Sequence, residues 1–356
     1  ETKCQLILGF GSKELLADDA CYSTIRKKYP HAEIALCSTA GEIFQTEVHD
    51  QTLSLTAFEF ESTPIETVSI NIKDFKNSYD AGVELIKKLP ETSLRFVFVL
   101  SDGSLVNGSE LVRGMGSVYS SSLPITGGLA GDGANFTSTL VGLNALPSTG
   151  NIIAIGFYGH RLKVTHGSMG GWDVFGMERT ITKSKANKLY EIDGKNALLL
   201  YKEYLGKYAE ELPGSALLFP LSVKLEGSSD PVVRTILSID NEDQCMVFAG
   251  DVPQGSSARF MKANFDRLID AAVDAAQSSV DQSESKSQRV ALLVSCVGRK
   301  LILGKRIEEE VEAVSETLGN DVLLSGFYSY GEISPLVMNA KCELHNQTMT
   351  ITCLGE

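Results

Sequence analysis

A short motif occurs twice, near the two ends of the chain. Residues 40–43 read Ala-Gly-Glu-Ile, and residues 330–333 read Tyr-Gly-Glu-Ile. The downstream segments match as well, because residues 49–52 read His-Asp-Gln-Thr and residues 345–348 read His-Asn-Gln-Thr. Related segments fold into related structural units, so a repeat of this length constrains the whole architecture. The sequence therefore predicts a chain built from two related halves.

Three segments share one order of strand, helix, strand and glycine-rich turn. Each reads as a βαβ unit with a parallel pair of strands. The predicted strands and helices span 5–9, 13–29 and 32–36 in the first unit, 95–100, 109–119 and 125–129 in the second, and 290–295, 306–318 and 322–325 in the third. Segments 53–57, 141–143 and 349–353 carry apolar residues at alternate positions, which is typical of antiparallel strands with one buried face.

The chain changes character near residue 188. A short helix is expected at 197–205, a long one from Arg259 to about Val280, and a polar, serine-rich loop at 281–288. With 356 residues, the length also favours about two domains. We predict an α/β fold with two related, pseudo-duplicated domains, residues 1–188 and 189–356. Their mixed β-sheets are expected to combine βαβ units with antiparallel strands.

Charge and hydropathy exclude several classes of protein. The formal net charge of −13 argues against a nucleic-acid-binding protein, since phosphates require a basic surface. The longest apolar runs are far shorter than the roughly 18 residues of a membrane-spanning helix. The first residues show no signal peptide, and the seven cysteines include no Cys-x-x-Cys pair. We therefore expect a cytoplasmic protein without membrane insertion and with buried thiols.

Several short motifs, spread over nearly the whole chain, resemble those of the FIST proteins and stand in the same order. They are residues 37–42 (Cys-Ser-Thr-Ala-Gly-Glu), 127–132 (Gly-Gly-Leu-Ala-Gly-Asp), 170–172 (Gly-Gly-Trp), 191–194 (Glu-Ile-Asp-Gly) with Ala197 and Tyr201, 329–333 (Ser-Tyr-Gly-Glu-Ile) and 345–348 (His-Asn-Gln-Thr). The resemblance implies linked FIST N and FIST C domains, which form a sensory, ligand-binding module.

The resemblance also implies a function. We expect a stand-alone bacterial sensory protein that signals to a separate partner, such as a histidine kinase or a cyclic-di-GMP signalling protein. One subset of the family, the nitric-oxide-sensing NosP type, binds haem through a histidine, so haem b with nitric oxide sensing is the leading expectation. The alternatives are a haem-free sensor of an amino acid or another small metabolite, and an interaction module without a ligand.

The repeated turns supply the first candidate ligand-binding residues. Glu42, Tyr330 and Glu332 follow strand ends, and ligands of α/β sheets usually bind at the carboxyl ends of parallel strands. The two turns are expected to face one another across a pocket. In the alternative interpretation, each glutamate accepts hydrogen bonds from nearby backbone N–H groups and fixes its own turn.

The turn of the second unit is rich in glycine. Gly128, Gly131 and Asp132 lie in a segment where bare N–H groups would accommodate a carboxylate or phosphate. No Gly-Lys-Ser/Thr follows, so the segment is not a P-loop, and no long helix begins there as in a dinucleotide-binding turn. A tight turn stabilised by Asp132 is the alternative.

Haem would require a histidine in a largely apolar pocket. His166 is the first candidate, because glycines, Met169 and the single tryptophan, Trp172, follow it. An exposed residue at a strand end is the alternative for His166. His160 and His345 are weaker candidates, and His345 belongs to the repeated segment, which favours a structural role.

Arg259 is the last candidate for ligand binding. At the start of the predicted long helix, its charge would add to the helix dipole and hold an anion. Ser257 as a simple N-cap explains the same segment. No Gly-x-Ser-x-Gly elbow and no Cys-His pair stands out in the sequence, and we therefore expect a protein that is not an enzyme.

Overall fold

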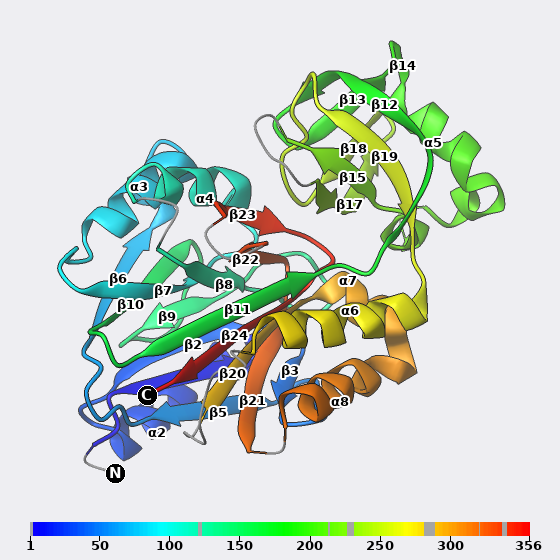
Figure 1. Ribbon diagram of the computed structural model, residues 1–356. Helices are drawn as coiled ribbons and strands as arrows, with labels where there is room; N and C mark the ends of the chain where they lie inside the picture. The colour runs from blue at the N-terminus through cyan, green and yellow to red at the C-terminus, as the bar shows by residue number, and fades with distance from the viewer. Residues whose placement is uncertain are drawn as a thin grey trace.

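The computed structural model describes residues 3–119, 123–212, 214–225, 231–280, 289–319, 321–336 and 340–356. The loop expected at 281–288 lies outside these residues. Within them, the chain forms a large body and a smaller lobe, and Figure 1 shows the lobe beside β23 at one end of the body.

The body contains three units of related layout. Unit 1 comprises β1 (Leu6–Gly11), α1 (Lys13–Leu16), α2 (Asp19–Lys28), β2 (Glu33–Ser38), β3 (Glu42–Phe44), β4 (Glu47–His49) and β5 (Leu53–Phe58). Unit 2 comprises β6 (Ile65–Asn71), a 3-10 helix (Ile72–Asp74), α3 (Ser78–Lys87), β7 (Leu94–Ser101), α4 (Gly108–Gly116), β8 (Ile125–Leu129), β9 (Val141–Leu143) and β10 (Asn151–Tyr158). Unit 3 comprises β11 (Lys163–Met169), α6 (Phe265–Ser278), β20 (Arg289–Cys296), α7 (Val297–Leu303), a 3-10 helix (Gly304–Arg306), α8 (Ile307–Leu318), β21 (Val322–Ser329), β22 (Gly331–Pro335), β23 (Cys342–His345) and β24 (Met349–Gly355).

The lobe is inserted between β11 and α6 of unit 3. It comprises β12 (Asp173–Lys185), β13 (Lys188–Ile192), β14 (Lys195–Asn196), α5 (Ala197–Leu205), 3-10 helices at Gly206–Glu211 and Gly214–Leu218, β15 (Leu221–Lys224), β16 (Val232–Arg234), β17 (Ile236–Asp240), β18 (Cys245–Phe248) and β19 (Ser257–Lys262). Its strands follow the order β16-β15-β19-β12-β13-β18-β17, and a separate apolar core joins them to α5.

Each sheet of the body is completed by a strand from another unit. The orders are β5-β1-β2-β9, β23-β22-β8-β7-β10-β6 and β11-β24-β20-β21-β3-β4. The pairs β1/β2, β7/β8 and β20/β21 are parallel. Beside the second strand of each pair lies a strand of the next unit: β9 joins unit 1, β22 joins unit 2 and β3 joins unit 3. The three units therefore exchange strands in a closed cycle.

This architecture confirms the predicted α/β fold class with mixed sheets and a repeated plan. Strands β1, β7 and β20 are buried over nearly their whole length, because the body covers both of their faces. The boundary predicted near residue 188 stays a prediction. It falls at the first residue of β13, which pairs with β12 in the lobe sheet.

The long helix expected from Arg259 to about Val280 is present as α6 (Phe265–Ser278), but its predicted start is wrong. Residues 257–262 form β19, in which Ala258 and Phe260 face the lobe core and Arg259 is exposed. Alternation of this kind suits a strand rather than a helix. The helix α6 begins at Phe265, and the side chain of Asn264 caps it in place of Ser257.

The helix expected at 13–29 is also divided, into α1 and α2. Ser12 caps the first, and the side chain of Asp18 accepts a hydrogen bond from the N–H of Ala20 to cap the second. An aspartate in this position favours a new helix start over a continuous helix.

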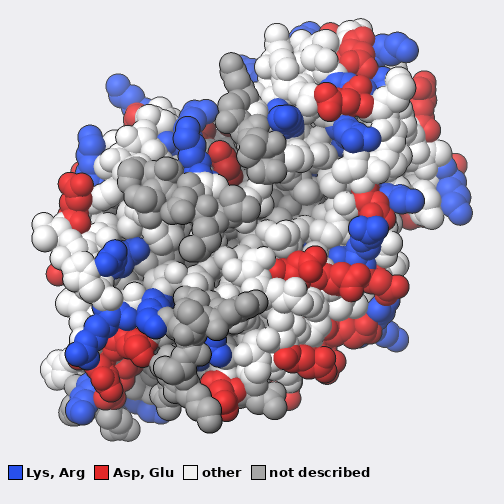
Figure 2. Space-filling view, in the orientation of Figure 1, with Lys and Arg blue, Asp and Glu red and all other residues white. Residues whose placement is uncertain are grey.

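The surface is consistent with the negative charge of the chain. Figure 2 shows Asp and Glu side chains gathered over α6 and α8 on the visible face. Among the described residues, no helix combines the length and the apolar character needed to cross a membrane.

A buried ion pair ties the helices of unit 3 to the passage between body and lobe. The Arg299 guanidinium donates to the Glu310 carboxylate at 2.8 and 3.0 Å and to the carbonyls of Gly170 and Leu268 at 2.7 and 2.6 Å. Both charged side chains are fully buried. Removing one partner of such a pair leaves an uncompensated charge without water.

We therefore expect Arg299→Met to lower the free energy of unfolding by about 3 to 5 kcal/mol. Arg306→Met is the matched control, because Arg306 pairs with Glu309 and Asp266 on the surface. Exposed pairs contribute little to stability. Urea unfolding followed by circular dichroism measures both variants. Equal losses for the two would contradict the assigned role of the buried pair.

Candidate functional site

The glycine-containing turns that end the three βαβ units lie together in the body. We call this place the turn junction; it consists of residues 38–42, 129–133 and 328–332. Backbone hydrogen bonds join the turns in a cycle: Ala40 N to Tyr328 O and Tyr328 N to Gly41 O at 2.8 Å, Gly131 N to Ser38 O at 2.8 Å, Gly133 N to Thr39 O at 3.1 Å, and Tyr330 N to Leu129 O at 3.1 Å. The junction thus brings together five of the predicted ligand-binding residues: Glu42, Gly131, Asp132, Tyr330 and Glu332.

Glu42 and Glu332 occupy equivalent places in their turns. Oε1 of Glu42 accepts from the hydroxyl of Thr39, and Oε2 accepts from the N–H and the hydroxyl of Thr52 at 3.1 and 2.8 Å. Glu332 repeats this pattern with Ser329 and Thr348, at 2.7 Å and at 3.1 and 2.9 Å. These contacts are those of the alternative interpretation, in which each glutamate fixes its own turn. A ligand contact for either residue stays a prediction.

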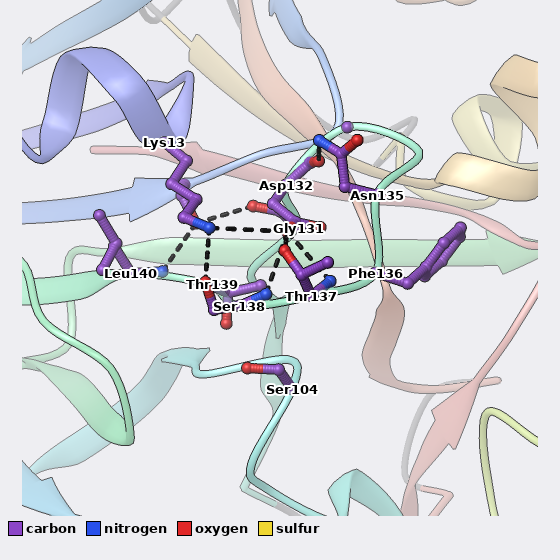
Figure 3. Close-up of polar contacts among 12 residues, drawn as sticks. Lys13, Ser104, Gly131, Asp132, Asn135, Phe136, Thr137, Ser138, Thr139 and Leu140 are labelled. Atoms are coloured by element: carbon purple, nitrogen blue, oxygen red, sulfur yellow. Dashed lines mark hydrogen bonds and ion pairs between the residues drawn. The ribbon is translucent and has the colours of Figure 1, made fainter.

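Asp132 organises the turn of unit 2, residues 129–133 (Figure 3). Its Oδ2 accepts from the N–H and the hydroxyl of Thr137 at 3.1 and 2.6 Å and from the N–H of Ser138 at 3.0 Å. Lys13 of unit 1 reaches the same oxygen at 3.8 Å and also donates to the Ser138 hydroxyl. Burial raises the pKa of Asp132, but these hydrogen bonds and one from Tyr330 outweigh it and hold the pKa below its ordinary value.

Tyr330 of unit 3 closes the same turn from the other side. Its hydroxyl donates to Oδ1 of Asp132 and accepts from the N–H groups of Asp132 and Phe136 at 3.1 and 3.0 Å. The Phe136 ring stacks on the Tyr330 ring with centroids 4.6 Å apart. The polar atoms around Asp132 are therefore engaged with one another.

Gly128 and Gly131 are explained by close packing of the chain. A Cβ on Gly128 would lie 2.6 Å from a methyl group of Val294, and one on Gly131 would lie 2.8 Å from the backbone nitrogen of Ala40. Glycine at these positions lets the strands of different units approach one another. A ligand contact for them stays a prediction.

The first predicted haem ligand, His166, is buried within a sheet, and haem binding stays a prediction. His166 lies within β11, opposite Thr352, and is 5% exposed, so the alternative of an exposed strand-end residue is wrong. Burial lowers its pKa, and its Nδ1 has no hydrogen-bond partner among the described residues. The imidazole is thus neutral, as iron requires. Thr352 opposite it donates a hydrogen bond to Thr126 of the neighbouring sheet at 2.8 Å.

The other two histidines are engaged elsewhere. Nε2 of His345 lies 2.9 Å from the carbonyl oxygen of Ser334, and burial lowers the pKa of His345 to about 4. His160 is exposed and contacts the Arg95 guanidinium. None of the three histidines lines either of the two pockets described below.

Trp172 and Arg259 lie outside the turn junction. The Trp172 indole donates to the carbonyl of Gln347 at 3.0 Å and packs against Met261 and Leu268, where the chain passes from body to lobe. Arg259 donates to the carbonyl of Gly176 within the lobe at 3.2 Å. Both have structural contacts, and their predicted ligand roles remain untested.

A pocket of about 920 Å³ lies between the body and the lobe. We call it the inter-lobe pocket. The body contributes α3 and α4 through Tyr79, Ser109 and Arg113, together with Glu343 of β23, while the lobe contributes Arg234 and Asp251. Its volume is within the usual range for small-molecule sites. A second, more open pocket of about 820 Å³ is lined by residues such as Gln5, His31 and Glu59 near the start of the chain.

None of the residues predicted from the sequence lines either pocket. Arg234 was missed, although the sequence contains a signal for it. Val232, Arg234 and Ile236 stand at alternate positions of an apolar segment, and all three are buried. A charged residue at an inward position of a strand is rare and requires a partner.

One group of side chains has the composition of a metal site. Ligand atoms of Asp240, Asp243 and Cys245 lie within 4.8 Å of one another. Lys188 already contacts both carboxylates, at 3.5 and 3.2 Å, and supplies the positive charge that a cation would bring.

The buried carboxyl of Glu332 predicts a pH dependence of stability. Burial raises its pKa to about 7 from an ordinary value of 4.5, although hydrogen bonds from Ser329 and Thr348 act against the shift. The folded state thus holds this proton more tightly than the unfolded state. The resulting stabilisation is fully present below pH 4.5 and is lost as the pH rises through 7.

Between pH 5 and pH 8, we expect the wild type to lose about 2 kcal/mol more stability than Glu332→Gln, which cannot titrate. Urea unfolding at both pH values measures this difference. Parallel pH profiles for the two proteins would rule out a raised pKa at Glu332.

Family models match nearly the whole chain. Residues 5–195 match the FIST N domain, and residues 197–335 match the FIST C domain. No curated protein matches the sequence. Among solved structures, the structure of PurLQS from Thermotoga maritima is similar at 8% sequence identity, over 89% of this chain and 74% of that chain, with a TM-score of 0.20. A TM-score this low does not indicate a shared fold. The chain belongs to the FIST family, whose domains are sensory and bind small ligands.

Proposed function

We propose that this FIST protein senses a small organic molecule that binds in the inter-lobe pocket. The observation that carries the proposal is the composition of the pocket wall, to which α4 and β23 of the body and two segments of the lobe all contribute. A ligand there contacts both parts at once. Its affinity therefore depends on how the lobe lies against the body.

This dependence provides a route for a signal. The polypeptide chain crosses between the body and the lobe twice, at residues 170–172 and at residues 263–264. A ligand that prefers one arrangement of two bodies shifts the population toward that arrangement. A partner that recognises the same arrangement reads the signal, and a histidine kinase or a cyclic-di-GMP signalling protein suits the sensory role of the family.

An amino acid or a similar small metabolite is the ligand class that we favour. The pocket wall combines aromatic rings with charged and polar groups, which suits a small polar molecule. Haem with nitric oxide sensing receives no comparable support, because His166, His160 and His345 lie outside the pocket. An interaction module without a ligand remains the outcome if no small molecule binds.

Two glycines give a matched test of the pocket. Gly116 lines it, Gly214 lies elsewhere, and a Cβ at either position meets no atom within 4 Å. Neither glycine has a positive φ. Gly116→Phe therefore adds a ring at the pocket wall, where we expect it to obstruct the pocket, while Gly214→Phe places the same ring outside it.

The measurement is a thermal-shift screen of the wild type with amino acids and small organic acids. A ligand at 100 times its Kd stabilises the folded state by about 2.7 kcal/mol, which raises the Tm by several degrees. We expect the shift to persist in Gly214→Phe and to disappear in Gly116→Phe. Equal shifts in both variants would place the ligand elsewhere, and no shift with any compound would favour the interaction module.

The absorption spectrum tests the haem alternative separately. We expect protein from haem-supplemented cells to lack a Soret band, since none of His160, His166 and His345 lines either pocket. A Soret band that disappears in His166→Ala would restore haem as the ligand.

A further inference from the structure

We propose that Arg234 is the anion-binding residue of the inter-lobe pocket, so that the ligand carries a carboxylate or a phosphate. The inference rests on the proposed function for the existence of a ligand in this pocket. It adds which chemical group the ligand presents and which residue receives it.

Arg234 is held in place by carbonyl groups. Its Nε donates to the carbonyl of Asp251 at 2.8 Å, and its Nη1 donates to the carbonyls of Val233 and Leu344 at 3.3 and 2.9 Å. Leu344 belongs to the body, so this side chain fastens the lobe to β23. Nη2 donates no hydrogen bond within the described residues, which leaves one edge of the guanidinium without a partner.

The charge of Arg234 has no direct carboxylate partner among the described residues. It and Arg299 are the two largest fully buried side chains of the described chain. Arg299 pairs with Glu310 at 2.8 Å, whereas no carboxylate of the described residues lies within 4.0 Å of the Arg234 guanidinium. Burial lowers the pKa of Arg234 to about 10, while Glu343 and Asp251 act against this at longer range. A buried cation normally has an anionic partner.

Of the two nearby carboxylates, Glu343 and Asp251, the second is held by other groups. Oδ1 of Asp251 accepts from the Asn107 side chain at 3.0 Å, and the backbone N–H of Asp251 donates to the Ser109 hydroxyl. Asp251 is thereby held against the first turn of α4. The backbone also leaves room for the guanidinium, because a Cβ on Gly250 would lie 3.0 Å from its Cζ and Nε.

Arg234 lines the inter-lobe pocket, and a planar guanidinium fork binds carboxylate and phosphate groups well. An anion that binds in the pocket therefore gives the Arg234 guanidinium the direct anionic partner that the described residues do not supply. Because the same guanidinium bonds to Leu344 of the body, the anion also binds at a contact between lobe and body.

The test follows the Nε–H resonance of Arg234 in arginine-labelled protein by NMR. The probes are sodium acetate and sodium phosphate at constant ionic strength, with chloride as the balancing salt, so that the two anions distinguish a carboxylate from a phosphate ligand. We expect a saturable shift with at least one of them, and no such shift in Gly116→Phe, which keeps Arg234 but adds a ring at the pocket wall.

Substitution supplies a second measurement. Arg234→Gln is expected to weaken binding of the effective anion by about ten-fold or more. The control is Arg306→Gln, since Arg306 is an exposed arginine that pairs with Glu309 and Asp266 and does not line the pocket. Its affinity should stay within about two-fold of the wild type. If Arg234→Gln does not fold, the wild-type and Gly116→Phe titrations decide.

The outcomes separate this inference from the proposed function. An Arg234 resonance that moves with neither anion, or an Arg234→Gln variant that folds and binds normally, overturns the anion-binding role. If a metabolite still gives a thermal shift that depends on Gly116, the pocket remains the ligand site. If no compound gives such a shift, the proposed function fails as well.

Discussion

The cycle of backbone hydrogen bonds at the turn junction is the constraint on which the rest of the body depends. Each turn leads the chain out of the sheet of its own unit and into the sheet of another unit. Strand edges left open by one unit are thereby paired by another, which removes unsatisfied backbone groups from the interior. A change in one turn therefore affects the edges of two sheets at once.

The repeated residues serve this constraint. Glu42 and Glu332 use both carboxylate oxygens within their own turns, and Asp132 with Tyr330 ties the turn of unit 2 to unit 3. Polar groups that are already saturated have little to offer a ligand. We expect polar groups that are available to a ligand in segments that do not belong to the repeat. The lobe inserted into unit 3 is the largest such segment.

Two buried arginines differ in their partners: one is paired with a carboxylate of the protein, and the other is the proposed binding residue for a ligand anion. Arg299 stands among helices of the body and has its carboxylate in Glu310. Arg234 lies where the lobe contacts the body, and among the described residues its guanidinium donates hydrogen bonds to carbonyl groups. A charge without a direct carboxylate partner thus lies at the inter-lobe pocket, where the proposed ligand would contact both parts.

The sequence by itself determined the α/β class, the βαβ units, the repeated turns and the family, because these follow from local periodicity and from motifs that need no distant partner. It misjudged residues 257–262, where burial in the lobe sheet outweighed the expected helix. It also did not reveal what Glu42 and Glu332 contact. Only the tertiary structure decided that the units exchange strands, that His166 is enclosed, and that Arg234 lacks a carboxylate. Each of these depends on contacts between residues far apart in the chain, and burial and pairing are properties of those contacts rather than of any segment.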